Sequence, residues 1–431
     1  MSQFGLTPAQ EWRRGWTVVL AAFVGFSFFS VMAAATGVFM EPLGREFGWN
    51  KTQTSSGVSI AGVITALGSP FFGILIDKWG TRRLALPGLV LMSLLTALFA
   101  LNTGSFGLWI AMWVTYGVIS LSIKSTVWST TVAAGFESAR GMALGVALCG
   151  TAFAQMITPP LANWLIASFG WRLAFVYLGL GWGGIALAVC IPFMHDLHLK
   201  AARRSASEPV RRPQLAGLTV RQAWRDRALW QIGISTFLMM LLTIGLMIHQ
   251  FQIMVEAGVS RANAAWLTSL FGLGGIVGKL LTGLLIDRYS PNWIGGLTLA
   301  SSALAFLLLM SQFATPALIV VAMAVNGYAS GTKIQITGYM TTRFAGLRNF
   351  GKIYGMMAAL TALGTALGPV VAGRIRDLTG EYTLFLGMGV VGSIISGLLI
   401  ITLPRYPAFE EEIEPKEAES LARPAAPIAG T

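Results

Sequence analysis

A lysine stands in the middle of an apolar segment long enough to cross a membrane, within Asn326-Gly-Tyr-Ala-Ser-Gly-Thr-Lys333-Ile-Gln-Ile-Thr337. An ammonium at the centre of a bilayer helix costs about 2.5–3.5 kcal/mol on insertion scales, so such a residue usually faces an aqueous cavity or a partner. Asn326, Ser330, Lys333 and Thr337 are four, three and four residues apart, which places them on one face of a helix. This pattern predicts a polar stripe around a buried cation, an arrangement suited to binding an anion.

Two other apolar segments also contain a lysine. Lys124 lies in a stripe with Tyr116, Ser120 and Trp128, at four-residue spacing, about half a chain earlier. Lys279 lies in a glycine-rich segment. In each expected helix the lysine falls about five residues past the midpoint, so a rise of about 1.5 Å per residue places all three at one depth. Three cations at one level predict an anion site.

Each lysine has an alternative interpretation. Its long stem can carry the ammonium to the lipid headgroups, in which case the residue only fixes the topology. The face around Lys279 also carries Gly272, Gly275 and Gly283, which is equally consistent with close helix packing.

Other polar and aromatic residues are candidates for shaping the pocket. They are Tyr116, Trp128, Asn326 and Gln335. His249 ends its apolar segment on the expected outer side and is followed by Gln250 and Gln252. A histidine near a helix end is more often interfacial than a carrier of protons or substrate, and both interpretations stay open.

The composition indicates a membrane protein. The chain of 431 residues is 55% hydrophobic and 11% charged, far from the values of soluble domains. Its net charge of +12 lies mainly in short segments between apolar runs, which is the positive-inside pattern and not a nucleic-acid surface. The sequence contains no metal-ligand cluster, phosphate loop or nucleophile elbow. We therefore expect no enzyme activity, catalytic residue, metal or cofactor.

Apolar runs of about 20 or more residues predict an all-α protein with transmembrane helices. Twelve ranges are expected: 15–40, 54–77, 84–103, 106–133, 140–168, 173–195, 229–255, 262–287, 293–313, 316–342, 350–376 and 383–404. A basic segment at the midpoint predicts six-helix bundles at 1–195 and 228–404, a cytosolic linker at 196–227 and a disordered cytosolic tail at 405–431. The alternation of basic loops places both termini in the cytoplasm.

A short motif occurs in both halves. Gly73-Ile-Leu-Ile-Asp77-Lys78-Trp79-Gly80-Thr-Arg82-Arg83 matches Gly283-Leu-Leu-Ile-Asp287-Arg288-Tyr289-Ser290, where serine replaces the last glycine. An aspartate at a helix end can hold positive charge or a helix N-terminus in one conformation and release it in another. The predicted conformational switch comprises Gly73, Asp77, Lys78, Gly80, Arg82, Arg83, Asp287 and Arg288.

On this motif and its repeat, the sequence resembles the major facilitator superfamily over essentially its whole length. The resemblance implies two pseudo-symmetric six-helix bundles. The segment from Gly37 to Trp49 is similar to the branch of monocarboxylate transporters and oxalate/formate antiporters. By the same resemblance, Lys279 occupies the place of an arginine that binds the substrate carboxylate. An aspartate one turn earlier in the monocarboxylate branch is here Gly275, so the proton-coupling scheme of that branch is not carried over.

These features predict a secondary transporter of small organic anions, mono- or dicarboxylates, in the plasma or inner membrane. Two halves would alternate access to a midplane site, by anion exchange or by proton symport. The expected partners are the anion, the bilayer and, for symport, protons; we expect a monomer. The alternative is a drug or cation exporter, which would be expected to carry an acidic residue deep in a span, and none of the 18 acidic residues lies there.

Overall fold

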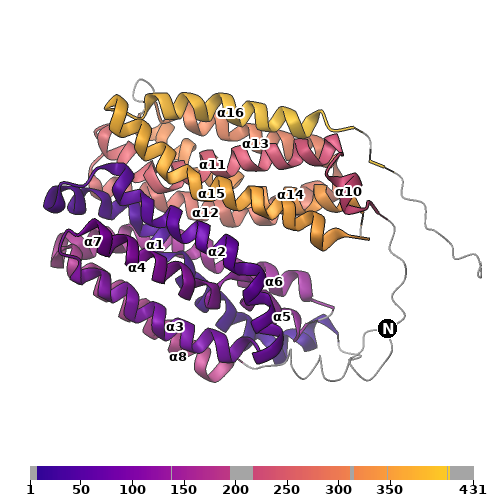
Figure 1. Cartoon of the computed structure of the whole chain (residues 1–431), viewed down its shortest axis with the longest axis horizontal. Helices are drawn as coiled ribbons and strands as arrows, with labels where there is room; N and C mark the ends of the chain where they lie inside the picture. Colours follow the sequence, from indigo (N-terminus) through magenta and orange to yellow (C-terminus); the bar gives the residue numbers. More distant parts are fainter. Residues whose placement is uncertain are drawn as a thin grey trace, which may run out of the picture.

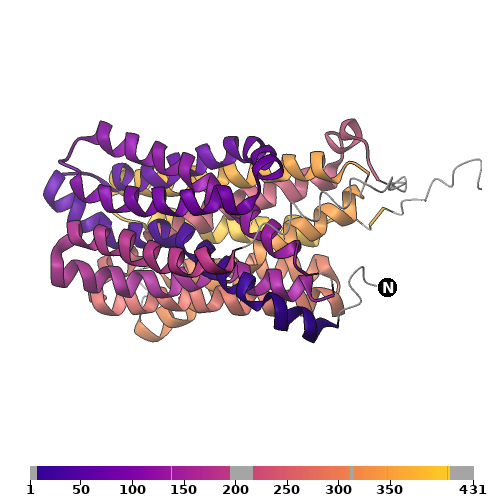
Figure 2. The same ribbon diagram turned by 90° about the horizontal axis from the view of Figure 1, so that it is seen from below.

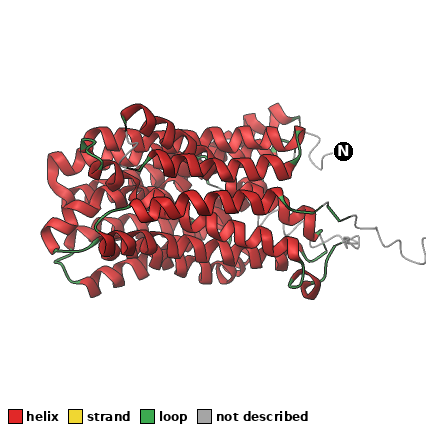
Figure 3. Cartoon of the chain, turned by 90° about the horizontal axis from the view of Figure 1, so that it is seen from above, coloured by secondary structure: helices red, strands yellow, loops and turns green. Residues whose placement is uncertain are grey.

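The computed structural model describes residues 7–136, 138–194, 217–310, 315–346, 348–404 and 406–407, without the side chains at positions 77, 283, 284 and 287. The helices of these residues run along the long axis of the molecule (Figures 1 and 2). Short loops join them at its two ends (Figure 3). Eleven helical segments of the described chain are long and apolar enough to cross a membrane. The predicted all-α membrane fold is confirmed.

The first half of the chain forms one bundle (Figure 1). Its helices are α1 (Pro8–Phe47), α2 (Lys51–Trp79), α3 (Thr81–Leu98), α4 (Phe106–Ser120), α5 (Ser125–Ala133), α6 (Arg140–Leu148), α7 (Gly150–Val176) and α8 (Gly183–Phe193), with 3₁₀ turns at Phe99–Leu101 and Leu121–Ile123 and a π-helical turn at Tyr177–Trp182. Helix α2 ends at Trp79 because Gly80 has a φ of 85°, a conformation that favours glycine.

The second half forms the other bundle (Figure 1). Its helices are α10 (Val220–Ala223), α11 (Arg227–Glu256), α12 (Arg261–Arg288), α13 (Pro291–Leu308), α14 (Pro316–Ala345), α15 (Phe350–Thr379) and α16 (Thr383–Ile401). The turn from α12 to α13 passes through Ser290 at a φ of −57°. This turn needs no left-handed residue, which explains why serine is tolerated where the first copy of the motif has Gly80.

One candidate span contains two crossings. The segment Arg140–Phe193 has 54 residues and includes Gly170, whose φ of 79° and ψ of 163° are not helical. The parts on either side correspond to the predicted fifth and sixth helices at 140–168 and 173–195. The eleven candidate spans therefore hold the twelve predicted crossings.

The predicted fourth helix, 106–133, is wrong in one respect, because it is not continuous. Lys124 is extended, with φ −73° and ψ 165°, and separates the 3₁₀ turn after α4 from α5. Tyr116 and Trp128 therefore do not share one helical stripe with Lys124. The hydroxyls of Ser120 and Ser122 donate to carbonyls three residues back, and such side-chain bonds compete with the helical ladder.

The two bundles approach each other at one end and separate toward the other (Figure 1). Helix α2 packs against α15, α7 against α12, and α1 against α11. Where α7 meets α12 the backbones nearly touch, since a Cβ added to Gly272 would lie 2.5 Å from the Met156 nitrogen. The ribbons of the two bundles lie further apart near the N-terminus and α10 (Figure 1). We call this the open end, and the end at which α2 begins and α15 finishes the closed end.

Most of the predicted linker, residues 196–216, lies outside the described chain. Its described part is held against the connection between α14 and α15. The Leu218 N–H donates to the Ala345 carbonyl at 2.8 Å, and the Asn349 amide donates to the Leu218 carbonyl at 3.0 Å. Of the predicted tail, 405–431, only residues 406–407 are described.

Candidate functional site

Lys333 lies inside the second bundle, on α14. Its side chain is 4% exposed, and its ammonium donates to the Thr243 hydroxyl of α11. That hydroxyl in turn donates to the Met239 carbonyl at 2.5 Å, so its oxygen is free to accept from the lysine. In the described part of the chain no carboxylate lies within 4.0 Å of this ammonium. The charge is therefore turned into the protein, away from the lipid headgroups, and has one hydroxyl as its recorded acceptor.

Lys333 belongs to a line of buried polar pairs between α11 and α14, which we call the polar seam. The Asn326 amide donates to the Gln250 side-chain oxygen at 3.3 Å on one side of the lysine, and the hydroxyls of Thr236 and Thr337 are 2.9 Å apart on the other. The α11 members, Thr236, Thr243 and Gln250, are seven residues apart, two helical turns each. That spacing is the signal that sequence reasoning missed, since only the α14 stripe was predicted.

The seam contains an unsatisfied acceptor. The Asn326 side chain is fully buried, and its Oδ1 has no hydrogen-bond partner among the described residues. Gln335, by contrast, is exposed and lies two residues after Lys333, about 200° around the helix. The two amides predicted for the pocket therefore lie in different surroundings.

Lys124 is held within the first bundle. At the break before α5 its ammonium donates to the Ser69 hydroxyl of α2 at 2.6 Å and lies 3.5 Å from the Thr65 carbonyl. The side chain is half-buried. Tyr116 and Trp128 are buried against α1: the Tyr116 hydroxyl is 3.5 Å from the Phe29 carbonyl, and a Cβ added to Gly25 would lie 2.1 Å from the Trp128 ring.

Lys279 crosses between the bundles. From α12 its ammonium donates to the Leu148 carbonyl at the end of α6, at 3.1 Å. Lys124, Lys279 and Lys333 lie 18, 18 and 17 residues after the starts of α4, α12 and α14 at Phe106, Arg261 and Pro316. For Lys279 and Lys333, in continuous helices, a rise of about 1.5 Å per residue corresponds to roughly 26–27 Å from the helix start. The rise does not apply to Lys124, which follows the end of α4 and a 3₁₀ turn, so the common depth of all three lysines stays a prediction.

His249 lies at the closed end and is fully buried. Its Nε2 is 3.0 Å from the Pro369 carbonyl, which can only accept, so Nε2 carries the proton. Its Nδ1 is 2.8 Å from the Tyr382 hydroxyl. Burial raises the pKa of Tyr382, in the loop between α15 and α16, well above its usual value, so the phenol keeps its proton. A neutral imidazole that carries its proton on Nε2 would accept from this phenol at Nδ1.

The residues of the predicted switch lie at the open end. The Arg82 guanidinium donates to the Met194 and Ile191 carbonyls at 2.5 and 2.9 Å, and so caps the end of α8 in its own bundle. Lys78, Arg83 and Arg288 are exposed. The side chains of Asp77 and Asp287 lie outside the described atoms. Within the described chain no group of three His, Cys, Asp or Glu residues could hold a metal ion.

Comparisons with known proteins agree with this architecture. The Major Facilitator Superfamily profile matches residues 18–257 and 243–429. Monocarboxylate transporter 13 of Bos taurus is 26% identical over 407 residues, covering 92% of this chain and 90% of its own. Monocarboxylate transporter 2 of Rattus norvegicus is 22% identical, covering 96% and 88%. The gallate transporter of Pseudomonas putida is 23% identical, covering 82% and 86%.

A solved structure shares the fold. It is a bacterial homologue of the human lysosomal transporter Spinster, in an inward-facing and unoccupied conformation, with a TM-score of 0.59 at 17% identity, covering 89% of this chain and 94% of its own. The profile match extends over nearly all of the sequence, and the two helical bundles agree with it. The chain belongs to the major facilitator superfamily.

Proposed function

We propose that the protein is a secondary transporter of small organic anions, mono- or dicarboxylates, that works by alternating access. The observation that carries this proposal is the Lys333 ammonium, buried without a carboxylate partner in the described chain. A buried charge is costly unless it is compensated, and a transported carboxylate would supply the missing compensation. The names of the relatives agree, since monocarboxylates and gallate are carboxylate anions.

The three lysines come from both bundles, which supports a site between them. Lys333 belongs to the second bundle and Lys124 to the first, while Lys279 already reaches from one to the other. An anion held by cations of both halves would keep a partner as the bundles rearrange. In this proposal Asn326 offers its free Oδ1 to a hydroxyl of the substrate. Tyr116, Trp128 and His249 do not contact the anion in this proposal but hold the helices around the site in place. Gln335 is the most peripheral member of the site.

Anion exchange is the favoured coupling. The described acidic side chains lie near helix ends or in connections: Glu11, Glu41, Glu46, Asp226, Glu256, Asp377 and Glu381. None is placed to carry a proton beside the lysines, and Gly275 stands one turn before Lys279. If the positively charged site cannot change its orientation while empty, the transporter returns to its starting conformation only with a second anion bound, which is exchange. Proton symport remains the competing coupling.

The runner-up function is a drug or cation exporter of the same superfamily. A cation would have to bind next to buried ammonium groups without a carboxylate in the described spans, which electrostatics disfavours. We further propose that the protein lies in the plasma or inner membrane with its basic loops and both termini in the cytoplasm. The open end would then face the cytoplasm.

Uptake into proteoliposomes tests the proposed function. A panel of labelled mono- and dicarboxylates, including an aromatic hydroxy acid, is compared with a lipophilic cation. We expect saturable uptake of at least one carboxylate and none of the cation. Uptake of the cation alone would instead support the exporter.

A further inference from the structure

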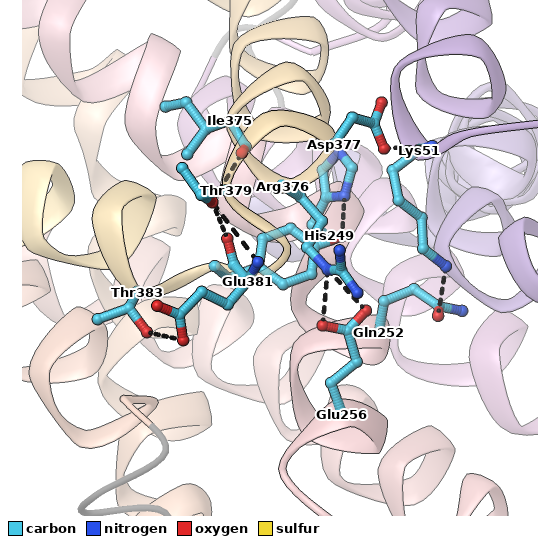
Figure 4. A network of polar contacts seen from close by, with 11 residues as sticks. Lys51, His249, Gln252, Glu256, Ile375, Arg376, Asp377, Thr379, Glu381 and Thr383 are labelled. Carbon is cyan, nitrogen blue, oxygen red and sulfur yellow. Dashed lines mark hydrogen bonds and ion pairs between the residues drawn. The ribbon is translucent and has the colours of Figure 1, made fainter.

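The last turns of α15 meet the first turn of α2 at the closed end (Figure 4). Asp377 of α15 accepts from three donors of α2 in the other bundle. One carboxylate oxygen accepts the Lys51 N–H at 3.0 Å, and the other accepts the Thr52 N–H at 2.8 Å and the Thr52 hydroxyl at 2.5 Å. A single side chain thus joins the two bundles through three hydrogen bonds.

These contacts complete the cap of α2. The first N–H groups of a helix have no partner within it and carry partial positive charge. Asn50 and Gln53 satisfy each other, with their side chains accepting from each other's N–H at 3.0 and 2.8 Å. The two N–H groups between them, those of Lys51 and Thr52, are the ones that Asp377 accepts. The second bundle therefore supplies half of the cap of a helix in the first.

Gln252 of α11 makes a second connection beside it. Its amide nitrogen donates to the Gly37 carbonyl of α1 at 2.8 Å, and its oxygen accepts from the Lys51 ammonium at 3.0 Å (Figure 4). The Ser55 hydroxyl of α2 donates to the Pro369 carbonyl of α15 at 3.1 Å. Each of these bonds crosses between the bundles, so each must break when the closed end opens.

The nearby ion pairs are less suited to control whether the closed end opens. Glu256 and Arg376 are both in the second bundle (Figure 4), so their pair survives separation. Glu41 binds Arg261 across the bundles but also Arg45 on its own helix, and it keeps that partner when the bundles part. Asp377 differs, because all the hydrogen bonds recorded for it come from α2 in the other bundle.

We propose that the Asp377 carboxylate is the lock of the closed end, and that its release from the N-terminus of α2 is required for this end to open. This role of Asp377 does not depend on which substrate is transported. The lock combines a full negative charge with fixed backbone donors, so its strength does not depend on ordering two long side chains. Gln252 carries no charge of its own, and of its two bonds the one to the Gly37 carbonyl is neutral while the one from Lys51 depends on placing a long, flexible side chain.

The test measures how often the closed end opens. Ala366 on α15 is 4% exposed and faces α2, where a Cβ added to Gly62 would lie 3.6 Å from its Cβ. A cysteine in place of Ala366 should react with a thiol reagent only when the bundles part here. The background carries Cys149→Ala and Cys190→Ala, which removes both native thiols. Labelling is done on purified protein in detergent without substrate, so the result is independent of the proposed function.

Asp377→Asn turns one acceptor of the lock into a donor that faces an N–H group and removes the charge. We expect labelling at position 366 to accelerate about tenfold, the factor that matches the loss of one hydrogen bond to a charged group. The matched control is Glu381→Gln, an exposed carboxylate that accepts from Thr383 within its own bundle. It should label at the original rate.

A second variant covers failure of Asp377→Asn to fold. Thr52→Val removes one donor and leaves the carboxylate in place, and it should accelerate labelling by about threefold. The cysteine pair Gly62→Cys with Ala366→Cys should form a disulfide in the parent, since the separation of the two Cβ positions fits the bond. Unchanged labelling in a folded Asp377→Asn or Thr52→Val protein, or equal acceleration in Glu381→Gln, would overturn the proposal.

Discussion

Lys124 and Lys333 occupy corresponding places in the two halves of the chain, yet the backbone conformation around them differs. Lys333 lies in a continuous helix, is 4% exposed and points at a hydroxyl of the neighbouring helix in its own bundle. Lys124 lies at a break between helices, is half-buried and has two oxygen atoms of α2 close to its ammonium. The same residue type is thus enclosed in one half and stands at an interruption in the other.

The break beside Lys124 is itself stabilised. A helix interruption frees carbonyl groups that must find new donors when they are buried. The Trp128 indole donates to the Ile123 carbonyl at 2.8 Å, the residue just before the lysine. Trp128, predicted to line the pocket, therefore supports the backbone that positions Lys124. Of the two lysines, Lys333 therefore has the greater free-energy cost of burying its charge. Its removal should lower the rate of transport more than the removal of Lys124.

The largest expected effect comes from removing that charge. A carboxylate that leaves water needs charged donors in exchange, and losing one should cost about 2–5 kcal/mol. Lys333→Ala should therefore lower the initial rate of carboxylate uptake by more than about 30-fold. Lys124→Ala should lower it by about tenfold, because the half-buried site can admit water. Lys352→Ala, which removes an exposed lysine at the start of α15, is the control. An equal loss of uptake in Lys124→Ala and Lys352→Ala would mean that the first bundle does not contribute to the site.

A smaller effect is expected from the partner of Lys333. Thr243→Val keeps the shape of the side chain but removes the hydroxyl that accepts from the ammonium. Hydrogen bonds to charged groups contribute about 1.5–3 kcal/mol, so uptake should fall roughly tenfold or more. Thr236→Val removes a neutral bond one pair further along the seam, and because such a bond contributes only about 0.5–1.5 kcal/mol, the loss in the same assay should be smaller, roughly two- to tenfold. The reverse order would place the functional part of the seam away from the lysine.

The last contrast concerns the two amides of α14. Asn326→Ala leaves the buried Gln250 oxygen without its donor, which should cost about 1–3 kcal/mol and show in the apparent affinity for hydroxylated carboxylates first. Gln335→Ala changes an exposed position and should stay within roughly 0.5 kcal/mol. Affinities measured by competition for uptake distinguish the two. A larger loss at Gln335 would mean that the exposed face of α14, and not the seam, lines the pathway.

Much of this architecture was predictable from hydrophobic runs. The number of crossings and the two bundles follow from segment lengths and from the rise of a helix. The stripe around Lys333 was predictable for the same reason, since α14 is continuous and keeps the helical period.

The features that sequence reasoning missed have two origins. The break at Lys124 is accompanied by local hydroxyl bonds that compete with the helical ladder. Other features depend on contacts between distant segments, as with the Thr243 partner, which lies 90 residues away in the chain. The lock at Asp377 joins residues 325 and 326 positions apart. An aspartate near a helix end gives no sign in the sequence of which N-terminus it will cap.

Counterflow is the most direct test of anion exchange around Lys333. Proteoliposomes are preloaded with an unlabelled carboxylate, and uptake of the labelled compound is followed with equal pH on both sides. We predict that preloading accelerates uptake and that Lys333→Ala abolishes this acceleration while Lys352→Ala does not. Accumulation driven by a pH gradient, with no response to preloading, would contradict the account and establish proton symport in place of exchange.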